Sequence, residues 1–450
     1  MKKHISFFVF IFFPLFIYCQ TIAILDTNSS IILKPKFYSV NSFEKNTQQN
    51  STYLLGLSFH SRFSENINFS SSVDYLFGNR NIVFNKYVDS LGVLPSFDLD
   101  NKRVQLNLSY QINKFINIKI GKGKHFIGEG YRSLFLSKEH APYNYLKIST
   151  EFGKIKYYNF YTTFINQNML DIGRKKHAAI HYLNYSINKY FHFGLFEAIL
   201  WQSKTYDFNT GYELAYLNPV IFYRPVEFSK HSSKGNALLG ASFDINIYKT
   251  TFYSQFLLDD LNISRRKDQD ENYQGGFFQN KFAYQFGVKT KLRDINILTE
   301  YNQVQPYTYG HRTILQNYSH MNQALAHPLG ANFKELVLRS DYTLNNWRFF
   351  LTLSTSKIGL DSIGTHYGQN IFASDLDAST GGQYSYGNFN GQGVNTMLNT
   401  LLAEISYSIK SFDVFGSVLY RKKDSDLVSQ NLLFYSIGLR NFPFSTLKDY

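Results

Sequence analysis

Apolar and polar residues alternate along most of the chain, which is the pattern of β-strands with one apolar and one polar face. From Val104 to Gln111 the sequence reads VQLNLSYQ, so apolar side chains occupy one face and polar side chains mostly the other. The same period recurs in residues 67–75, 116–120, 282–289 and 401–409. Many of these stretches approach about ten residues, the length of a tilted membrane strand, whereas strands in soluble sandwiches are usually about 5 to 6 residues long. The pattern therefore predicts an all-β fold, a transmembrane antiparallel outer-membrane β-barrel.

The connections between the predicted strands are asymmetric. Very short turns fall near Arg62, Asn113, Gly153, Lys189, Lys249, Asn345 and Ser411, and long polar stretches separate one strand pair from the next. We count about 18 strands from Ile32–Val40 to Asn431–Arg440, and one miscounted hairpin would give about 16 or 20. If the N-terminus starts in the periplasm, most short turns are periplasmic and most long loops are extracellular. That arrangement is typical of outer-membrane barrels.

The N-terminus has the pattern of an export signal. A positively charged start, Met1–His4, precedes an apolar stretch from Ile5 to Tyr18. We expect residues 1–19 to be a cleaved signal peptide, residues 20–31 a short periplasmic segment and residues 32–450 the barrel. Cys19, the single cysteine, could instead be the lipidated residue of a lipoprotein, although Tyr18 is bulky for the preceding position. Cleavage after Cys19 would leave no cysteine for a disulfide, a metal site or a nucleophile.

The amino-acid composition excludes some classes of binding partner. Charged residues make up 18% of the chain, below the roughly 25% of soluble domains, and aromatic residues also reach 18%. The net charge of +13 favours acidic partners, but Lys and Arg form no continuous stripe, so we expect no nucleic-acid partner. The expected surroundings are outer-membrane lipid and lipopolysaccharide, with the protein as a monomer. The chain ends in Tyr450 after an amphipathic strand, which is typical of substrates of the barrel assembly machinery.

Several charged residues should point into the lumen by the phase of their strands. These are Lys119, Lys281, Lys289, Arg348 and Glu404. Because buried charges need partners, we expect them to pair with each other and with loops that fold inward. The sequence therefore predicts a mostly occluded lumen.

The stretch from Gly121 to Tyr143 is rich in glycine and invites comparison with a nucleotide-binding loop. Position 126 is Phe where G-x-G-x-x-G requires Gly, and neither a P-loop lysine nor a helical pattern follows, so that interpretation fails. The simpler interpretation is a loop whose glycines, including Gly128 and Gly130, permit tight folding into the barrel mouth. Direct contact with a ligand is the alternative.

The segment Phe126–Ser137, with Ala141 and Pro142 after it, resembles the glycine-rich segment of the Wzi capsule-assembly family. The matching positions are Gly128, Gly130, Ser133, Leu134, Ser137 and Pro142. Leu217–Phe222 with Gly235–Gly240 is similar to that family's second shared region. His327–Phe333 resembles the variant in Bacteroidota, a branch that includes the gliding-motility protein RemB.

This resemblance implies a barrel of about 18 strands that acts as a surface lectin and helps to organise capsular polysaccharide. For the gliding relatives it implies a connection with motility and surface polysaccharide. The chain departs from the family where Phe126 and Tyr131 replace tryptophans. It also departs where residues 20–30 are too short for the helical bundle that precedes the barrel in the capsule proteins.

The long loop Tyr367–Asn395 has a composition suited to carbohydrate, with aromatic faces for sugar CH groups and amides or hydroxyls for sugar OH groups. The same composition suits an ordinary loop or a protein-binding surface. Together with the resemblance, it leads us to expect a polysaccharide site at the mouth, formed by Tyr131, Arg132, Tyr384 and Tyr386. Arg132 would favour an acidic polysaccharide, or the anionic lipopolysaccharide around the barrel.

Two other classes of function remain open. A diffusion porin is compatible with about 18 strands and polar inward faces. An enzyme is disfavoured because the loop histidines stand in no recognised nucleophile or metal motif, and a metal site from His125, Glu129 and His140 has little support. We therefore predict a non-enzymatic barrel without cofactor or metal that binds or organises surface polysaccharide, in capsule assembly or in gliding motility.

Overall fold

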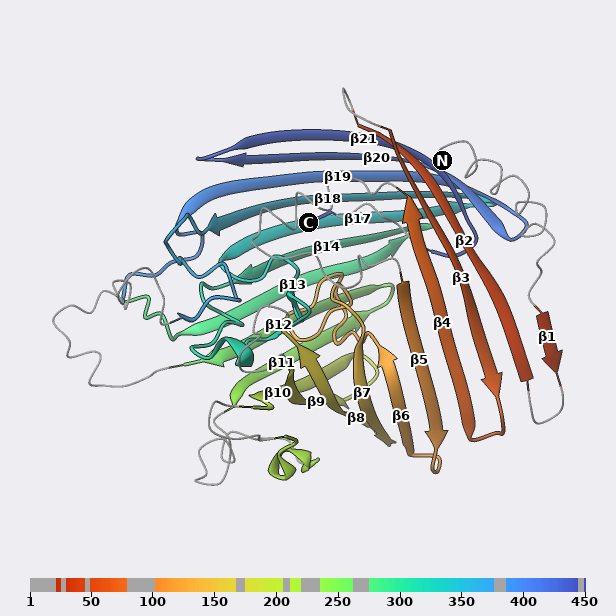
Figure 1. Cartoon of the computed structure of the whole chain (residues 1–450), viewed down its shortest axis with the longest axis horizontal. Coiled ribbons are helices and arrows are strands. Elements are labelled where there is room, and N and C mark those ends of the chain that lie inside the picture. Colours follow the sequence, from red (N-terminus) through yellow and green to blue (C-terminus); the bar gives the residue numbers. More distant parts are fainter. Residues whose placement is uncertain are drawn as a thin grey trace.

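The computed structural model describes residues 22–25, 30–44, 49–78, 102–166, 175–204, 211–219, 235–261, 275–375, 386–443 and 449–450. They form a 19-stranded antiparallel sheet in which β1 pairs only with one end of β2, so 18 strands make up a closed wall (Figure 1). The predicted fold class is therefore confirmed. Among the residues just given, no helix is long and apolar enough to cross a membrane.

Each wall strand pairs with its neighbours in chain order, and each overlaps one strand predicted from the sequence. The wall consists of β2 (Ser30–Glu44), β3 (Gln49–Arg62), β4 (Ile67–Gly78), β5 (Lys102–Gln111), β6 (Ile116–Gly123), β7 (Tyr143–Phe152), β8 (Ile155–Ile165), β9 (Lys175–Ser186), β10 (Phe191–Gln202), β11 (Asn236–Ile247), β12 (Thr250–Asp260), β13 (Lys281–Leu292), β14 (Ile295–Val304), β17 (Phe333–Leu344), β18 (Trp347–Leu360), β19 (Val394–Ile409), β20 (Phe412–Ser425) and β21 (Ser429–Arg440). Pairing of Tyr38–Glu44 on β2 with β21 closes the barrel.

The sequence pattern did not predict β1 (Ile22–Leu25), which lies within the segment expected to precede the barrel. It pairs antiparallel with the first residues of β2, Leu25 standing opposite Ser30. Because β3 occupies the other edge of β2 along its whole length, β1 and β21 share the remaining edge.

The alternation along each strand decides which side chains face the lumen. On β5 the apolar Val104, Leu106 and Leu108 are exposed on the outside, as a lipid-facing band requires. Asn107, between them in sequence, faces inward and accepts a hydrogen bond from the Tyr145 hydroxyl (3.1 Å). Polar side chains that face inward in this way bind the connections that enter the lumen.

The two ends of the barrel differ as predicted. At one end, short turns such as Gly153-Lys154 and Tyr248-Lys249 join consecutive strands, and Tyr248 adopts a φ of 52°, the left-handed conformation that suits a tight hairpin. At the other end most connections are long, although β2–β3 and β20–β21 are joined by short ones. Outer-membrane barrels place their short turns in the periplasm, which fixes the orientation used below.

One segment covers part of the outer wall. Residues 211–219, which include the short helix η2 (Leu214–Leu217), lie outside β8–β10. Tyr216 packs on Trp201 of β10 with ring centroids 4.8 Å apart, and the Tyr161 hydroxyl donates to the Leu217 carbonyl (2.8 Å). Trp201 is fully buried, so protein rather than lipid covers this part of the wall.

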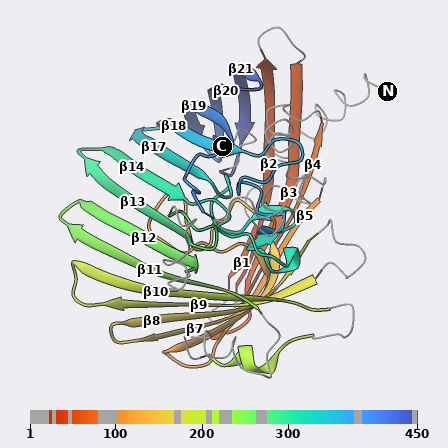
Figure 2. The same ribbon diagram turned by 90° about the vertical axis from the view of Figure 1, so that its left-hand side faces the viewer.

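The main core lies inside the barrel. It is formed by inward residues of the wall and by apolar residues of the connections between β6 and β7, between β14 and β17, and between β18 and β19. The second of these connections contains η3 (Ile314–Gln316), β15 (Ser319–His320) and β16 (Gln323–Ala324). In Figure 2, these connections and the C-terminus lie within the ring of strands.

Tyr450 does not follow directly on the last strand. Strand β21 ends at Arg440, where the Asn441 side chain accepts from the Phe37 N–H (2.7 Å) and donates to the Pro35 carbonyl (2.8 Å), replacing further strand pairing. Tyr450 is buried in the lumen and its hydroxyl donates to Glu139 (2.8 Å). The last strand therefore ends at Arg440, as predicted, and Tyr450 follows it at a distance along the chain. Recognition by the assembly machinery stays a prediction.

Candidate functional site in the barrel lumen

The connection between β6 and β7, residues 124–142, enters the lumen, and we call it the inner loop. Ile127 and Leu136 form an antiparallel bridge, so the loop folds back on itself. The Ser133 hydroxyl donates to the Ile127 carbonyl (2.5 Å) and accepts from the Leu136 N–H (3.2 Å). From β12, the Gln255 amide donates to the Ile127 carbonyl (3.1 Å) and accepts from the Leu134 N–H (2.8 Å). One serine and one wall residue thus fix the shape of the loop.

Two glycines allow the inner loop to lie directly against the wall. Gly128 has a φ of +133°, and a Cβ there would stand 2.2 Å from Nε2 of Gln255. A Cβ at Gly130 would stand 2.3 Å from Oε2 of Glu300. A Cβ at either position would displace the Gln255 or Glu300 side chain that binds the loop, and the positive φ of Gly128 favours glycine in itself.

The inner loop shares an apolar core with the connection between β14 and β17. Leu134 and Phe135 are fully buried, and Phe135 stacks on Phe196 of β10 with ring centroids 4.6 Å apart. The hydroxyls of Tyr309 and Tyr318 donate to the carbonyls of Leu134 (2.9 Å) and Phe135 (2.7 Å). Two connections far apart in sequence therefore form one body inside the barrel, which we call the plug.

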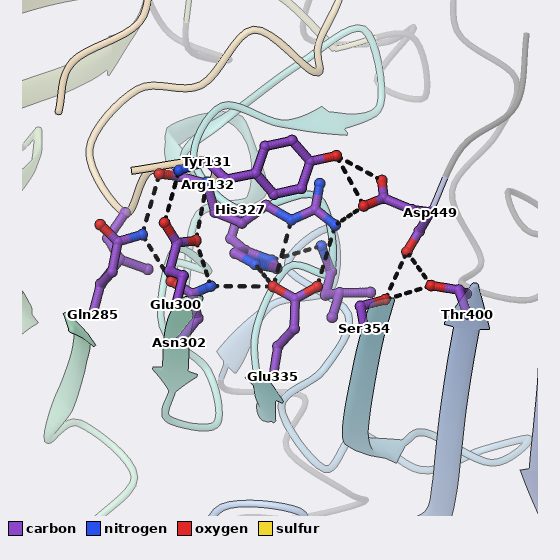
Figure 3. Close-up of polar contacts among 12 residues, drawn as sticks. Tyr131, Arg132, Gln285, Glu300, Asn302, His327, Glu335, Ser354, Thr400 and Asp449 are labelled. Atoms are coloured by element: carbon purple, nitrogen blue, oxygen red, sulfur yellow. Dashed lines mark hydrogen bonds and ion pairs between the residues drawn. The ribbon is translucent and has the colours of Figure 1, made fainter. Parts of the chain in front are cut away.

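Arg132 lies at the centre of a buried ion-pair cluster (Figure 3). Its guanidinium contacts Glu335 on β17 (3.2 Å) and Asp449 (3.3 Å), and its side chain is 1% exposed. Glu335 also accepts from Nε2 of His327 (2.7 Å), whose Nδ1 accepts from the Leu329 N–H (3.2 Å). These two bonds place the proton on Nε2, and burial lowers the pKa of His327, so the ring is neutral. One guanidinium therefore serves two carboxyl groups.

Glu300 on β14 binds the backbone of the same segment. Its carboxylate accepts from the N–H groups of Tyr131 (2.7 Å) and Arg132 (3.0 Å). Asn302 donates to both Glu300 (2.9 Å) and Glu335 (3.1 Å) and so links the two acids. Hydrogen bonds to ionised groups are stronger than neutral ones, and a buried charge that loses its partner is strongly destabilising. This network holds the inner loop to β14 and β17 (Figure 3).

The structure brings together only part of the polysaccharide site predicted at the mouth. The guanidinium groups of Arg132 and Arg339 lie 4.4 Å and 3.8 Å from the centre of the Tyr131 ring. Tyr386 contacts Phe277 instead, with ring centroids 5.6 Å apart. Tyr384 lies outside the described residues.

The expected position of Arg132 at the mouth is wrong. The acids on the wall and at residue 449 hold its side chain inside the plug, where no surface is left for a polysaccharide.

Two further residues of the glycine-rich motif, Ser137 and Pro142, bind the connection between β14 and β17. The Ser137 N–H donates to the Leu325 carbonyl (2.8 Å), and the Pro142 carbonyl accepts from Nε2 of His320 (3.3 Å). Nδ1 of His320 accepts from the Ile165 N–H (3.0 Å), so this ring is neutral too. Burial lowers the pKa of His320 to about 3.

Two of the five inward charges pair as predicted with connections that fold inward, and two pair instead with other wall residues. Lys281 binds Asp375 (2.6 Å), Lys289 binds Glu129 of the inner loop, Arg348 binds Asp341 (2.5 Å), and Glu404 binds Arg440. The first two pairs tie folded-in connections to β13. Lys119 differs, because it stands opposite a second lysine, Lys147, in the pairing of β6 with β7.

A polar cavity of about 480 Å³ remains in the lumen beside the inner loop. Residues 125–129 of the inner loop form one side, and inward residues of β7 to β11 form the other. Lys156, Ser186, His192 and Asn246 belong to its lining and lie close to the short turns. The cavity is therefore in the periplasmic half of the barrel.

Sequence reasoning missed the residues that hold the inner loop, namely Gln255, Glu300, Glu335 and Asp449. The three wall residues were recognisable as polar groups at inward positions of their strands. Because a carboxylate that faces a filled lumen needs a cation or N–H donors, an acidic residue at an inward position indicates that a loop binds there. Nothing in the sequence indicated which loop would supply them.

Neither a protein-family model nor a curated protein matches the chain. Solved structures do match. The chain is similar to Wzi, described as an outer membrane protein involved in group 1 capsule assembly in Escherichia coli and a carbohydrate-binding β-barrel. The TM-score is 0.59 and the identity 14%, covering 91% of this chain and 84% of that one. It is also similar to the outer membrane protein OprD from Pseudomonas aeruginosa, with a TM-score of 0.50 and 11% identity, covering 92% and 94% of the two chains. At these identities the likeness establishes the fold, a bacterial outer-membrane β-barrel.

Proposed function

We propose that this protein is a non-enzymatic outer-membrane barrel that binds and organises polysaccharide at the cell surface. The observation that carries the proposal is the plug. A porin retains a water-filled passage, whereas here the inner loop and the connection between β14 and β17 share one apolar core. Buried ion pairs tie the inner loop and the connection between β18 and β19 to the wall. The fold of a carbohydrate-binding barrel and the resemblance at Phe126–Ser137 support the same function.

Within this function the polysaccharide serves either capsule assembly and attachment or gliding motility, as in the Bacteroidota branch that includes RemB. Both roles require a barrel that holds polysaccharide at the outer membrane, where lipopolysaccharide surrounds it. Neither role requires the passage of solutes. The protein acts as a monomer in this proposal.

Two measurements on the purified full-length barrel test it. On a glycan array, we expect binding to a restricted set of surface polysaccharides. In planar bilayers, we expect no large steady currents. Porin-like conductance together with an array free of binding would overturn the proposal in favour of a diffusion porin.

A further inference from the structure

The periplasmic cavity beside the inner loop carries unpaired positive charge. The Lys147 ammonium lies over the rings of Tyr158 (4.3 Å) and Phe160 (5.0 Å), which also line the cavity. Lys119 stands directly opposite Lys147 in the β6–β7 pairing, and residues opposite each other share a face. In the part of the chain that the structure describes, neither ammonium forms an ion pair with a carboxylate.

Two like charges directly opposite each other on neighbouring strands destabilise the sheet unless something neutralises them. The neighbouring His125 cannot do so, because an imidazole is either neutral or positively charged; burial, with Lys147 as the next contribution, lowers its pKa to about 3. The imidazole is therefore neutral, and its Nδ1 lies 3.1 Å from the Tyr143 hydroxyl. The two lysines thus point to an anion supplied from outside the chain.

The β11 end of the same wall has the reverse character. Asp244 on β11 lines the same cavity and is 7% exposed. Glu129 of the inner loop also faces the cavity but is bound to Lys289. A small dense anion such as phosphate would be repelled by Asp244, whereas a hydroxyl-rich ligand would donate hydrogen bonds to its carboxylate.

Polar and aromatic groups occupy the stretch of wall between the two charged ends. Tyr182 and Asn184 belong to this stretch, and the Tyr182 hydroxyl is held by Ser242 at 3.0 Å. Ring faces beside amide and hydroxyl groups suit the CH and OH surfaces of a sugar. The volume of about 480 Å³ falls within the range of about 300 to 1,000 Å³ typical of small-ligand sites.

We propose that this cavity binds an acidic stretch of polysaccharide, a few sugar units long, from the periplasmic side, with a carboxylate at Lys147, beside Lys119, and hydroxyls at Asp244. The proposal rests on the proposed function and names the chemical class of its ligand. A neutral sugar leaves both lysines without an anion, and a simple anion makes no use of Asp244. A short carboxylated oligosaccharide satisfies both ends.

Calorimetric titration of the full-length barrel with trigalacturonate, maltotriose and inorganic phosphate tests this. We expect binding of trigalacturonate, far weaker binding of maltotriose, and weak binding of phosphate. Lys147→Met keeps an apolar stem over the two rings and should weaken trigalacturonate binding about 10-fold or more, the effect of losing one charged hydrogen bond. Asp244→Asn should weaken trigalacturonate and strengthen phosphate.

Lys114→Met is the matched control, because Lys114 also lies over an aromatic ring, that of Phe115 (4.8 Å), but belongs to a short turn outside the cavity. It should bind trigalacturonate like the unmodified protein. Heat-modifiable migration on gels checks that every variant is folded, and Lys119→Met provides a second test if Lys147→Met fails to fold.

The outcomes separate this proposal from the proposed function. If the barrel binds polysaccharide on the array but folded Lys147→Met and Asp244→Asn bind trigalacturonate unchanged, the cavity proposal is overturned and the general function stands. Phosphate binding as tight as trigalacturonate binding also overturns the cavity proposal. Lysine-dependent trigalacturonate binding supports it even if cells lacking the protein retain their polysaccharide, a result that would count against the general function alone.

Discussion

Replacing Arg132 with methionine should release the inner loop from the wall while the wall itself stays folded. Methionine keeps an apolar side chain of similar reach but removes the ion pairs with Glu335 (3.2 Å) and Asp449 (3.3 Å). Two carboxyl groups then share a buried site without a cation. The backbone pairing of β17 with β14 and β18 does not involve this side chain and should persist.

The size of the effect follows from the burial of the cluster. Removing one partner of a buried ion pair typically costs about 3 to 5 kcal/mol, much of it from the charge left uncompensated. Glu335 keeps hydrogen bonds from His327 and Asn302, so we expect the lower end of this range. A loss of about 3 kcal/mol increases the ratio of released to docked loop by about 100-fold.

Hydrogen exchange of the inner-loop amides measures the docking equilibrium. In Arg132→Met, protected amides such as those of Leu134 and Leu136 should exchange about 100-fold faster. The double variant Arg132→Met/Glu335→Gln should recover part of the protection, because one uncompensated charge is gone.

Arg348→Met is the control, since it removes an exposed ion pair with Asp341 and should change stability by no more than about 1 kcal/mol. Unchanged exchange in a folded Arg132→Met barrel would refute the view that these ion pairs hold the inner loop.

Three further changes probe the same plug. Gly130→Ala should weaken docking of the inner loop by about 1 to 3 kcal/mol, because its Cβ would overlap Glu300. Gly416→Ala is the control and should have little effect, because the nearest neighbour of its Cβ would be 3.9 Å away. Equal hydrogen exchange in both variants would contradict this. In the docked plug the pKa of His320 is lowered from 6.5 to about 3, so protonation favours release of the connection between β14 and β17. Docking of this connection should be complete above pH 6.5 and should weaken as the pH falls toward 3. Exchange at pH 7 and pH 5 measures this, and His320→Gln should reduce the difference. Asp375→Asn leaves the buried Lys281 without its carboxylate and should raise protease sensitivity of residues 361–375, while intact resistance would show that other contacts suffice.

The strands and their order followed from the sequence alone. A period of two residues assigns each side chain to the lipid or to the lumen, and tight turns join consecutive strands, so local information is enough to specify an antiparallel wall. The pairing of inward charges was also foreseeable, because a charge facing a filled lumen must be neutralised. The short β1 escaped prediction because four apolar residues carry no clear period.

The interior was decided only by the tertiary structure. Connections have no periodic pattern, and the contacts that place them join residues very far apart: Arg132 and Glu335 are separated by 203 positions, and Tyr131 and Asp449 by 318. The sequence marked Arg132 as notable but suggested an exposed ligand-binding cation. Burial and two acidic partners make it a buried structural link instead, because a guanidinium that has lost its water must keep its carboxylate partners, and losing one costs far more than at the surface.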